Sequence, residues 1–118
     1  MKSPAKALQA LRDFGLTFPG AHLKSPWPNH ADLAVNDKTF AYLPKDDTHF
    51  SISCKLPQSA AEALKLPYCS PTGYGLGKWG WVTAAIEDGA IPVDRFKEWI
   101  DESYRSQAPK KLLRQLDE

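Results

Sequence analysis

The first third of the chain alternates short apolar runs with polar turns. Apolar residues recur at helical spacing between Ser3, a capping hydroxyl followed by a proline, and Gly15, and this pattern predicts a helix. Residues 18–20, Phe-Pro-Gly, predict a turn, and residues 25–28, Ser-Pro-Trp-Pro, predict an irregular connection.

Three strands are predicted next. Apolar residues 32–35 and 39–43 flank the polar triplet Asn-Asp-Lys at 36–38, and this arrangement is typical of a hairpin. In residues 49–54, apolar and polar side chains alternate, which predicts a strand with one buried face and one wet face.

The second half of the chain predicts two helices around two strands. Pro57 opens a short helix that ends near Leu66, and Ser59 with Glu62 has the spacing of a capping box. Residues 68–69 begin a short strand, and residues 79–86 form another. A helix from Pro92 to before residue 109 carries its apolar side chains on one face. These side chains are Phe96, Trp99, Ile100 and Tyr104.

The order of elements is helix, three strands, helix, two strands, helix. It predicts an α+β two-layer domain, in which helices pack on a mostly antiparallel sheet. A chain of 118 residues is expected to form a single domain, 1–118, with residues 107–118 as a basic C-terminal tail whose leucines add a final turn.

Composition places the chain among globular proteins. The apolar fraction of 42% argues against a long disordered chain. No apolar run reaches the length of about 18 residues that a membrane span needs. The N-terminus lacks the apolar stretch of a signal peptide, and Cys54 and Cys69 fit reduced thiols rather than a disulfide framework. We therefore expect a cytosolic, monomeric protein that does not enter membranes.

The net charge of +1 is unevenly distributed. Residues 1–80 hold nine basic and six acidic side chains, residues 81–104 hold two and six, and residues 105–118 hold four and two. The three segments therefore carry net charges of +3, −4 and +2. Because the total is close to zero, only local basic patches argue for nucleic-acid binding.

A glycine-rich segment, residues 73–79, leads into a predicted strand. It does not match the phosphate-binding loop of nucleotide hydrolases, because the glycines enclose too few residues and Trp79 replaces the Mg²⁺-binding hydroxyl. We interpret it as a loop that can meet the backbone of a nucleic acid, with Lys78 supplying charge and Trp79 stacking on a base. The alternative is a solvated lysine beside a tryptophan that covers the edge of the core.

No pattern of catalytic or metal-binding residues stands out. The candidate metal ligands, which lack the spacing that forms a site in advance, are His22, His30, Asp32 and His49. Cys54 lies on the apolar side of its strand and is expected to be an inert buried thiol, whereas Cys69 is more accessible and would be the reactive thiol in a pairing with His49. We expect no enzyme activity and no cofactor.

The candidate binding residues are basic and aromatic. Lys38 sits at a predicted hairpin tip, Lys55 at a strand end and Lys78 at a strand entry, so a basic patch forms if these positions converge. Trp79 and Trp81, two residues apart on one strand, are expected to share a face, and either face of that strand can be the buried one. Lys110, Lys111 and Arg114 make a second patch in the tail.

The sequence resembles the MmcQ/YjbR family in an ordered set of short stretches over nearly the whole chain. The first are Phe-Pro-Gly at 18–20 and Pro-Trp at 26–27, with Val35, Lys38 and Phe-Ala at 40–41. The next are Ser-Cys-Lys at 53–55 with Pro57, and Leu-Gly-Lys-Trp-Gly-Trp-Val at 76–82. The last are Pro92, Ile-Asp-Glu-Ser-Tyr at 100–104 and Ala-Pro-Lys-Lys-Leu at 108–112.

The resemblance implies an α+β fold shared with frataxin-like (CyaY-like) and secretion-chaperone-like domains. It also implies DNA binding through a double-wing surface of paired hairpins. By position the wing residues are Lys38, Lys55, Lys78 and Trp81. Trp79 is a departure, because the family often has a basic residue or histidine there, and it replaces a phosphate contact with a stacking one.

Three functional hypotheses follow. The first is a non-catalytic DNA-binding protein that uses Lys38, Lys55, Lys78, Trp79 and Trp81, with weak binding dominated by the phosphate backbone. The second is a module that binds a peptide or small molecule in a groove lined by Trp27, Trp79 and Trp81. The third, an iron-handling role, draws only on carboxylates that are more simply the wet face of the last helix. These are Asp94, Glu98, Asp101 and Glu102.

Overall fold

A computed structural model of the chain describes residues 4–25, 30–44, 50–73, 75–87 and 89–116. The first half contains α1 (Pro4–Gly15), β1 (Ala21–Lys24), β2 (Asp32–Val35), β3 (Lys38–Ala41) and β4 (Phe50–Lys55). The second half contains α2 (Ala60–Ala63), β5 (Cys69–Pro71), the 3₁₀ helix η1 (Leu76–Trp79), β6 (Trp81–Ile86), α3 (Val93–Gln107) and α4 (Lys110–Leu116). The α+β class predicted from the sequence is confirmed.

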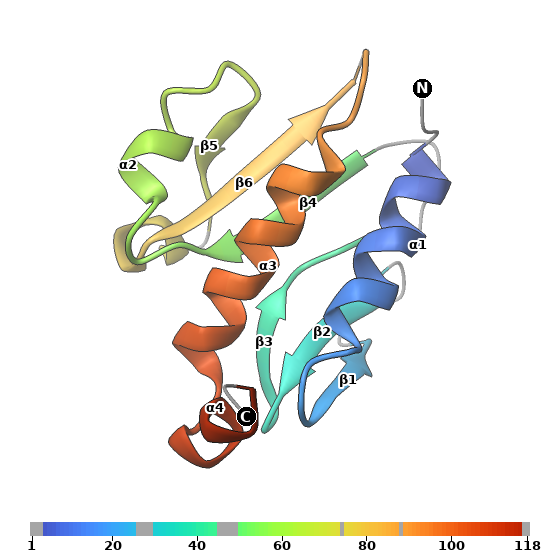
Figure 1. Ribbon diagram of the computed structural model, residues 1–118. Coiled ribbons are helices and arrows are strands. Elements are labelled where there is room, and N and C mark those ends of the chain that lie inside the picture. Colours follow the sequence, from blue (N-terminus) through green and yellow to red (C-terminus); the bar gives the residue numbers. More distant parts are fainter. Residues whose placement is uncertain (1–3, 26–29, 45–49, 74, 88, 117–118) are drawn as a thin grey trace.

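The strands form two antiparallel sheets of three, in the orders β1-β2-β3 and β4-β6-β5. Two isolated bridges, His30 with Pro44 and Tyr42 with Ser53, extend the pairing beyond the strands, and the second of them joins the two sheets. In this bridge the Tyr42 amide donates to the Ser53 carbonyl at 2.9 Å, and the Ser53 amide donates back at 3.2 Å. The α1 and α3 helices cover one face of the combined sheet (Figure 1).

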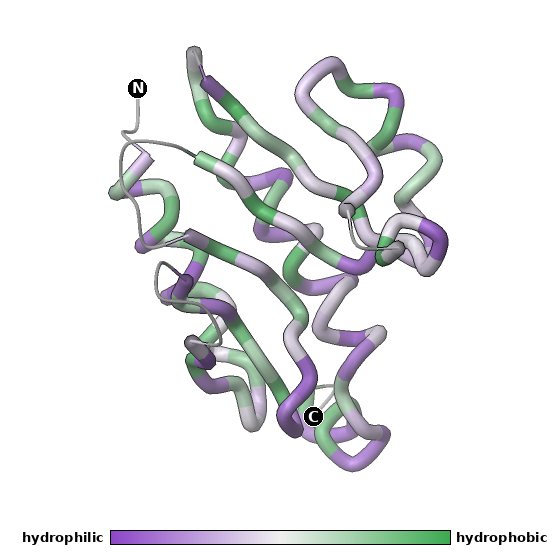
Figure 2. The backbone as a smooth tube through the Cα atoms, turned by 180° about the vertical axis from the view of Figure 1, so that it is seen from behind, coloured by the Kyte–Doolittle hydropathy of each residue, from purple (hydrophilic) through white to green (hydrophobic). Residues whose placement is uncertain are grey.

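The opposite face of the sheet, which we call the open face, has no described helix lying across it (Figure 2). Strand β4 shows the division most simply. Phe50, Ile52 and Cys54 are buried toward the helices, whereas Ser51, Ser53 and Lys55 are half-buried on the open face. This alternation is the one predicted from the sequence, and it fixes which polar side chains a ligand can reach.

The core lies between the helices and the sheet. On α3, Phe96, Trp99, Ile100 and Tyr104 are buried, as their spacing predicted. The Tyr104 ring packs against Phe18 and Phe40, with centroid distances of 4.7 and 5.3 Å. The Tyr104 hydroxyl donates to the Pro19 carbonyl at 2.5 Å, so the predicted turn is tied to the last long helix.

The predicted hairpin is confirmed, and a bulge follows it. Asn36 and Asp37 adopt positive φ angles of 50° and 63°, as a two-residue turn of this kind requires. Between β2 and β3 the register then shifts by one residue, because Leu33 pairs with Ala41 and Ala34 pairs with Thr39. The extra residue places both Phe40 and Ala41 in the core and returns Tyr42 to the open face, beside Ser53.

The order of elements needs one correction near the N-terminus. Strand β1, which the sequence pattern did not predict, pairs with β2 at the edge of its sheet. Its burial does not alternate, since His22 and Leu23 are both exposed, and therefore its sequence carries no period-two signal. The expected irregular connection at 26–28 and the capping residue Ser3 lie outside the described residues, as does His49, the first residue of the predicted third strand.

Two other local predictions were wrong. The α2 helix is a single turn, and the Ser59 side chain makes no capping bond to it, so the predicted capping box does not form. Instead, Ser59 bonds to Glu102 of α3. Strand β6 begins at Trp81 rather than at residue 79, because η1 and Gly80, with φ of 90°, precede it.

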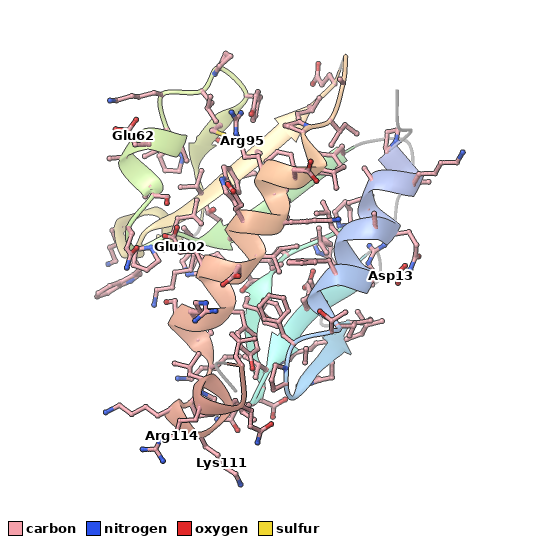
Figure 3. All side chains as sticks on the ribbon, in the orientation of Figure 1. Asp13, Glu62, Arg95, Glu102, Lys111 and Arg114 are labelled. Carbon is pink, nitrogen blue, oxygen red and sulfur yellow. The ribbon has the colours of Figure 1, made fainter. Side chains whose placement is uncertain are left out.

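The basic tail packs against the domain as α4. Leu112, Leu113 and Leu116 are partly buried against the core, which confirms that the leucines add a final turn. Lys111 and Arg114 point away from the body of the protein (Figure 3). The helix α4 lies beside the start of β3 in both views (Figures 1 and 2), so Lys38 belongs to this end of the molecule.

Candidate functional site on the open face

A cluster of hydroxyl groups lies on the open face where β4, β6 and the end of β5 meet. Ser53 and Thr83 are directly opposite each other in the β4–β6 ladder, and their hydroxyl oxygens are 2.7 Å apart. The Thr72 hydroxyl is 2.9 Å from that of Thr83. Three hydroxyl protons serve two internal bonds, so the cluster has one more proton to donate than these bonds consume.

A buried carboxylate in the other sheet bonds to His30. Asp32, with a side chain that is 0% exposed, accepts hydrogen bonds at Oδ1 from the Leu43 amide at 2.8 Å and from His30 Nδ1 at 3.0 Å. Its second oxygen, Oδ2, is buried and has no hydrogen-bond partner among the described residues. Asp32 thereby fixes the orientation of the His30 ring and leaves Nε2 as the ring nitrogen available to other groups.

Arg12 supports the carboxylate from α1. Its guanidinium donates to the Ala31 carbonyl at 3.1 Å and to the Pro44 carbonyl, so it holds the two strand extensions that carry His30. Burial lowers the pKa of Arg12, and the charge of Asp32 opposes that shift. Tyr42 lies close enough to respond as well, because burial first and the Asp32 charge second raise the pKa of its phenol.

A cavity of about 570 Å³ opens between these two groups. Its lining comes from the junction of the two sheets and from the segment after β5. The lining residues are His30, Tyr42, Ser53, Thr72, Gly73, Leu76 and Thr83. This volume lies in the range of small-molecule sites, and the walls combine apolar surface with a few converging polar groups.

The segment that closes the cavity also carries the most exposed aromatic residue on the described surface. Gly73 and Leu76 line the cavity, and η1 continues from Leu76 to Trp79. Trp79 is 64% exposed, and the Lys78 ammonium lies 5.5 Å from the centroid of its ring. Lys78 and Trp79 are thus neighbours of the cavity in the chain and remain accessible to solvent.

The structure brings together only some of the predicted binding residues. Lys55 pairs with Trp81 across the β4–β6 ladder, and the Leu56 amide donates to the Gly80 carbonyl at 2.8 Å. Lys55, Lys78 and Trp79 therefore share one corner of the molecule, which we call the η1 corner. Lys38 does not join them, because it begins β3 at the α4 end (Figure 1).

The two tryptophans do not share a face, contrary to the prediction. Trp79 belongs to η1, while Trp81 is 6% exposed and packs on Tyr42 with a centroid distance of 5.2 Å. Neither tryptophan lines the cavity, and Trp27 lies outside the described residues. The β6 side chains Val82 and Ala84 are buried toward the helices, which answers the question of which face of this strand enters the core.

Burial raises the pKa of both cysteines, and two of the α3 carboxylates are bonded to other residues of the protein. Cys54 is fully buried, and burial raises the pKa of its thiol far above the ordinary range, with a further contribution from Glu102. Burial also raises the pKa of Cys69, against the effect of Arg95. Glu102 accepts bonds from the segment before α2, and Asp101 pairs with Arg105 at 2.5 Å.

The described residues contain neither a cluster of metal ligands nor a helix that could span a membrane. No group of three or more His, Cys, Asp or Glu side chains in the described part of the chain is arranged to hold a metal ion. None of the described helices is both long enough and apolar enough to cross a membrane.

Sequence reasoning missed the residues around the cavity. His30 and Asp32 were considered only as metal ligands, and Tyr42, Thr72 and Thr83 were not considered. The available signal was weak: Ser53 and Thr83 occupy wet positions of alternating strands, as many surface residues do. Only the fold shows that these positions meet on an uncovered face.

Comparison with known proteins identifies the chain's relatives. The chain is similar to a protein from Pseudomonas syringae whose crystal structure was solved by a structural genomics consortium. The identity is 22%, the TM-score is 0.63, and the match covers 84% of this chain and 97% of that one, which shows a common fold. No protein of curated function matches the chain significantly. The family model YjbR matches residues 16–106, well over half of the sequence, and the chain therefore belongs to the YjbR family.

Proposed function

We propose that this chain is a non-catalytic DNA-binding protein that contacts DNA at the η1 corner. The observation that carries the proposal is Trp79, 64% exposed with the Lys78 ammonium 5.5 Å from its ring. Folding leaves most of this apolar ring exposed to water, and stacking on a base would bury it. A lysine beside it would neutralise the adjacent phosphate.

Lys55 supplies the second charge of the η1 corner. It projects from the open face, next to the segment that carries Lys78. None of the described residues that line the cavity is an aspartate or a glutamate. The carboxylate bonded to His30, that of Asp32, is fully buried. A phosphate backbone that approaches the corner would therefore meet two ammonium groups without an exposed carboxylate beside the cavity.

Two contacts predict weak and moderately salt-dependent binding. A duplex that releases counterions from two phosphates should lose affinity with a slope of roughly −1.8 in log–log terms. The β2–β3 hairpin with Lys38 and the segment with Lys78 are the candidate wings of the double-wing surface. Because they lie at different corners, Lys38 would add a third contact only on DNA long enough to span both. Cytosolic location and a monomeric state stay predictions.

The alternative of a tryptophan-lined groove has less support. Trp81 is packed on Tyr42 rather than exposed, so among the described residues Trp79 is the single tryptophan offered to a partner at this corner. An isolated aromatic ring beside a lysine fits a base and its phosphate better than it fits the continuous apolar surface that a peptide would need.

The test is a salt titration of binding to a mixed-sequence duplex and to the single strand, measured by fluorescence anisotropy. The comparison includes Lys78→Glu and a control, Lys97→Glu, which makes the same charge change on α3, in the layer that covers the opposite face. We expect Lys78→Glu to weaken binding by roughly tenfold and to reduce the slope by about one, with no comparable change for the control. Equal affinity and slope for wild type and Lys78→Glu, or no binding at low salt, would overturn the proposal.

A further inference from the structure

We propose that the cavity on the open face holds the base of an unpaired nucleotide whose phosphate is bound by Lys78. This inference rests on the proposed function and deepens it, because it assigns a ligand class to residues outside the basic corner. The cavity is built from both sheets: His30 and Tyr42 come from the first sheet's strand extensions, and Ser53 and Thr83 come from the second.

The walls define the chemistry of the occupant. Hydroxyls of Ser53, Thr72 and Thr83 line one side, and each can donate or accept as its proton rotates. The Tyr42 ring and Leu76 provide apolar surface. Among the lining residues none carries a fixed charge, so the enclosed part of the ligand is uncharged. A flat ring with donors and acceptors on its edge and apolar faces has these properties, and a nucleobase is such a ring.

The buried Asp32 indicates that the histidine wall is arranged for a ligand. A fully buried carboxylate is costly, and here its Oδ2 lacks a partner among the described residues. Its Oδ1 accepts a hydrogen bond from His30 Nδ1, so Nε2 is the ring nitrogen that remains to meet the edge of a base. Because Arg12 fixes the strand carbonyls at Ala31 and Pro44, the imidazole is supported from behind.

The position of the cavity beside the η1 corner supplies the remaining link. Gly73 and Leu76 line it, and Lys78 follows two residues after Leu76. A base inside the cavity would therefore carry its phosphate toward a lysine, and Trp79 would meet the next base along a strand. The same chemistry fits a free mononucleotide or an unpaired position in single-stranded DNA, and the experiment separates these two sources.

The variants exploit Gly73 and Thr83. A Cβ atom added at Gly73 meets nothing within 4 Å, and the backbone there does not have a positive φ, so Gly73→Leu adds bulk at the cavity without straining the backbone. The matched control is Ala85→Leu, which adds similar bulk on the same strand face as Thr83, at an exposed residue outside the cavity. Thr83→Val keeps the shape of the side chain and removes the central hydroxyl, with Ser51→Ala as the control for a half-buried hydroxyl of the open face.

The probes are a single strand of about ten nucleotides, the same strand with every base removed, and a deoxynucleoside monophosphate. We expect the intact strand to bind roughly tenfold more tightly than the abasic one, and Gly73→Leu and Thr83→Val to abolish most of that difference while the controls keep it. If Lys78→Glu weakens binding but base removal and Gly73→Leu do not, the cavity inference is overturned and the DNA surface stands.

The monophosphate distinguishes the remaining outcomes. Binding of the monophosphate that Gly73→Leu abolishes, without binding of either strand, would support the cavity as a site for free nucleotides and overturn the DNA proposal. If neither the strands nor the monophosphate bind at low salt, both proposals are overturned. Circular dichroism and urea unfolding show whether Gly73→Leu folds. If it does not fold, Thr83→Val tests the cavity in its place.

Discussion

Glu102 should stabilise the fold by linking α3 to the segment that leads into α2. Its Oε2 accepts the amides of Gln58 at 2.9 Å and Ser59 at 3.1 Å, and its Oε1 accepts the Ser59 hydroxyl at 2.5 Å. One carboxylate thus satisfies two backbone donors near the start of a helix, a role that the Ser59 side chain does not perform. Figure 3 shows Glu102 on the side of α3 that faces α2.

The expected cost of Glu102→Ala follows from these three bonds. Hydrogen bonds to a charged acceptor contribute roughly 1.5–3 kcal/mol each when water cannot replace them. Here Gln58 is exposed and Ser59 is half-buried, so water replaces part of what is lost. We expect a decrease of about 2 kcal/mol in the free energy of unfolding. Glu102→Gln keeps one acceptor oxygen and should lose about half of that.

Urea unfolding followed by circular dichroism measures the effect. A loss of about 2 kcal/mol should lower the midpoint by about 1 M with an unchanged slope. The control is Glu98→Ala, one turn earlier on α3, where the carboxylate is exposed and the change should stay within about 0.5 kcal/mol. If Glu102→Ala and Glu98→Ala unfold at the same urea concentration, the bonds to α2 do not stabilise the fold and the reasoning is wrong.

Two further predictions use pairs of like residues in different surroundings. Trp81→Ala should lower the free energy of unfolding by about 3 kcal/mol, because the ring is 6% exposed and packed on Tyr42. Trp79→Ala should change the free energy of unfolding by less than about 0.5 kcal/mol, because that ring is exposed. Equal urea midpoints for the two variants would contradict this prediction. Iodoacetamide near pH 8 should modify Cys69 slowly and Cys54 only after unfolding, since burial raises the pKa of both thiols and encloses Cys54 completely. Peptide mass mapping measures the labelling of each cysteine. If Cys54 is labelled in the native protein at the rate of Cys69, the prediction that Cys54 is inaccessible is wrong.

The elements predicted correctly are those whose burial repeats along the chain. In β4 every second side chain enters the core, and on α3 the buried residues recur at helical spacing, so the local sequence alone contains the signal. The hairpin at Asn36 and Asp37 was likewise predictable, because both residues tolerate positive φ. In these cases tertiary contacts reinforce a preference that the segment already has.

The elements that were missed depend on partners far away in the sequence. Strand β1 is an edge strand with two exposed central residues, and it is a strand because β2 pairs with it. The backbone amides just before α2 are bound by Glu102, more than forty residues away, while the nearby Ser59 and Glu62 fit the capping pattern without forming it. Local sequence reasoning assigns a hydrogen-bond partner to the nearest suitable side chain and cannot identify one that another helix supplies.

The candidate site was predictable only at its rim. Lys78 and Trp79 were predicted as binding residues because they end a glycine-rich segment, and Trp79 is exposed in the structure. The cavity behind them depends on the bulge that turns Tyr42 to the open face, and no residue type marks a bulge at Phe40 and Ala41. A regular β3 would have pointed Tyr42 into the core, away from Ser53.

The cavity lies at the junction of the two sheets. Among the described residues one bridge, between Tyr42 and Ser53, joins the two sheets, and both of its residues line the cavity. On the helix side, α3 holds the sheets together, because Gln107 donates to the Thr39 carbonyl at 3.1 Å while Ser103 accepts the Lys55 amide at 2.9 Å. On the open face, an occupant between His30 and Thr83 would contact both sheets beside the bridge that joins them. Binding there would therefore be sensitive to the angle between the sheets, which is why rigid support from Arg12 and Asp32 belongs to the site as much as the groups that touch the ligand.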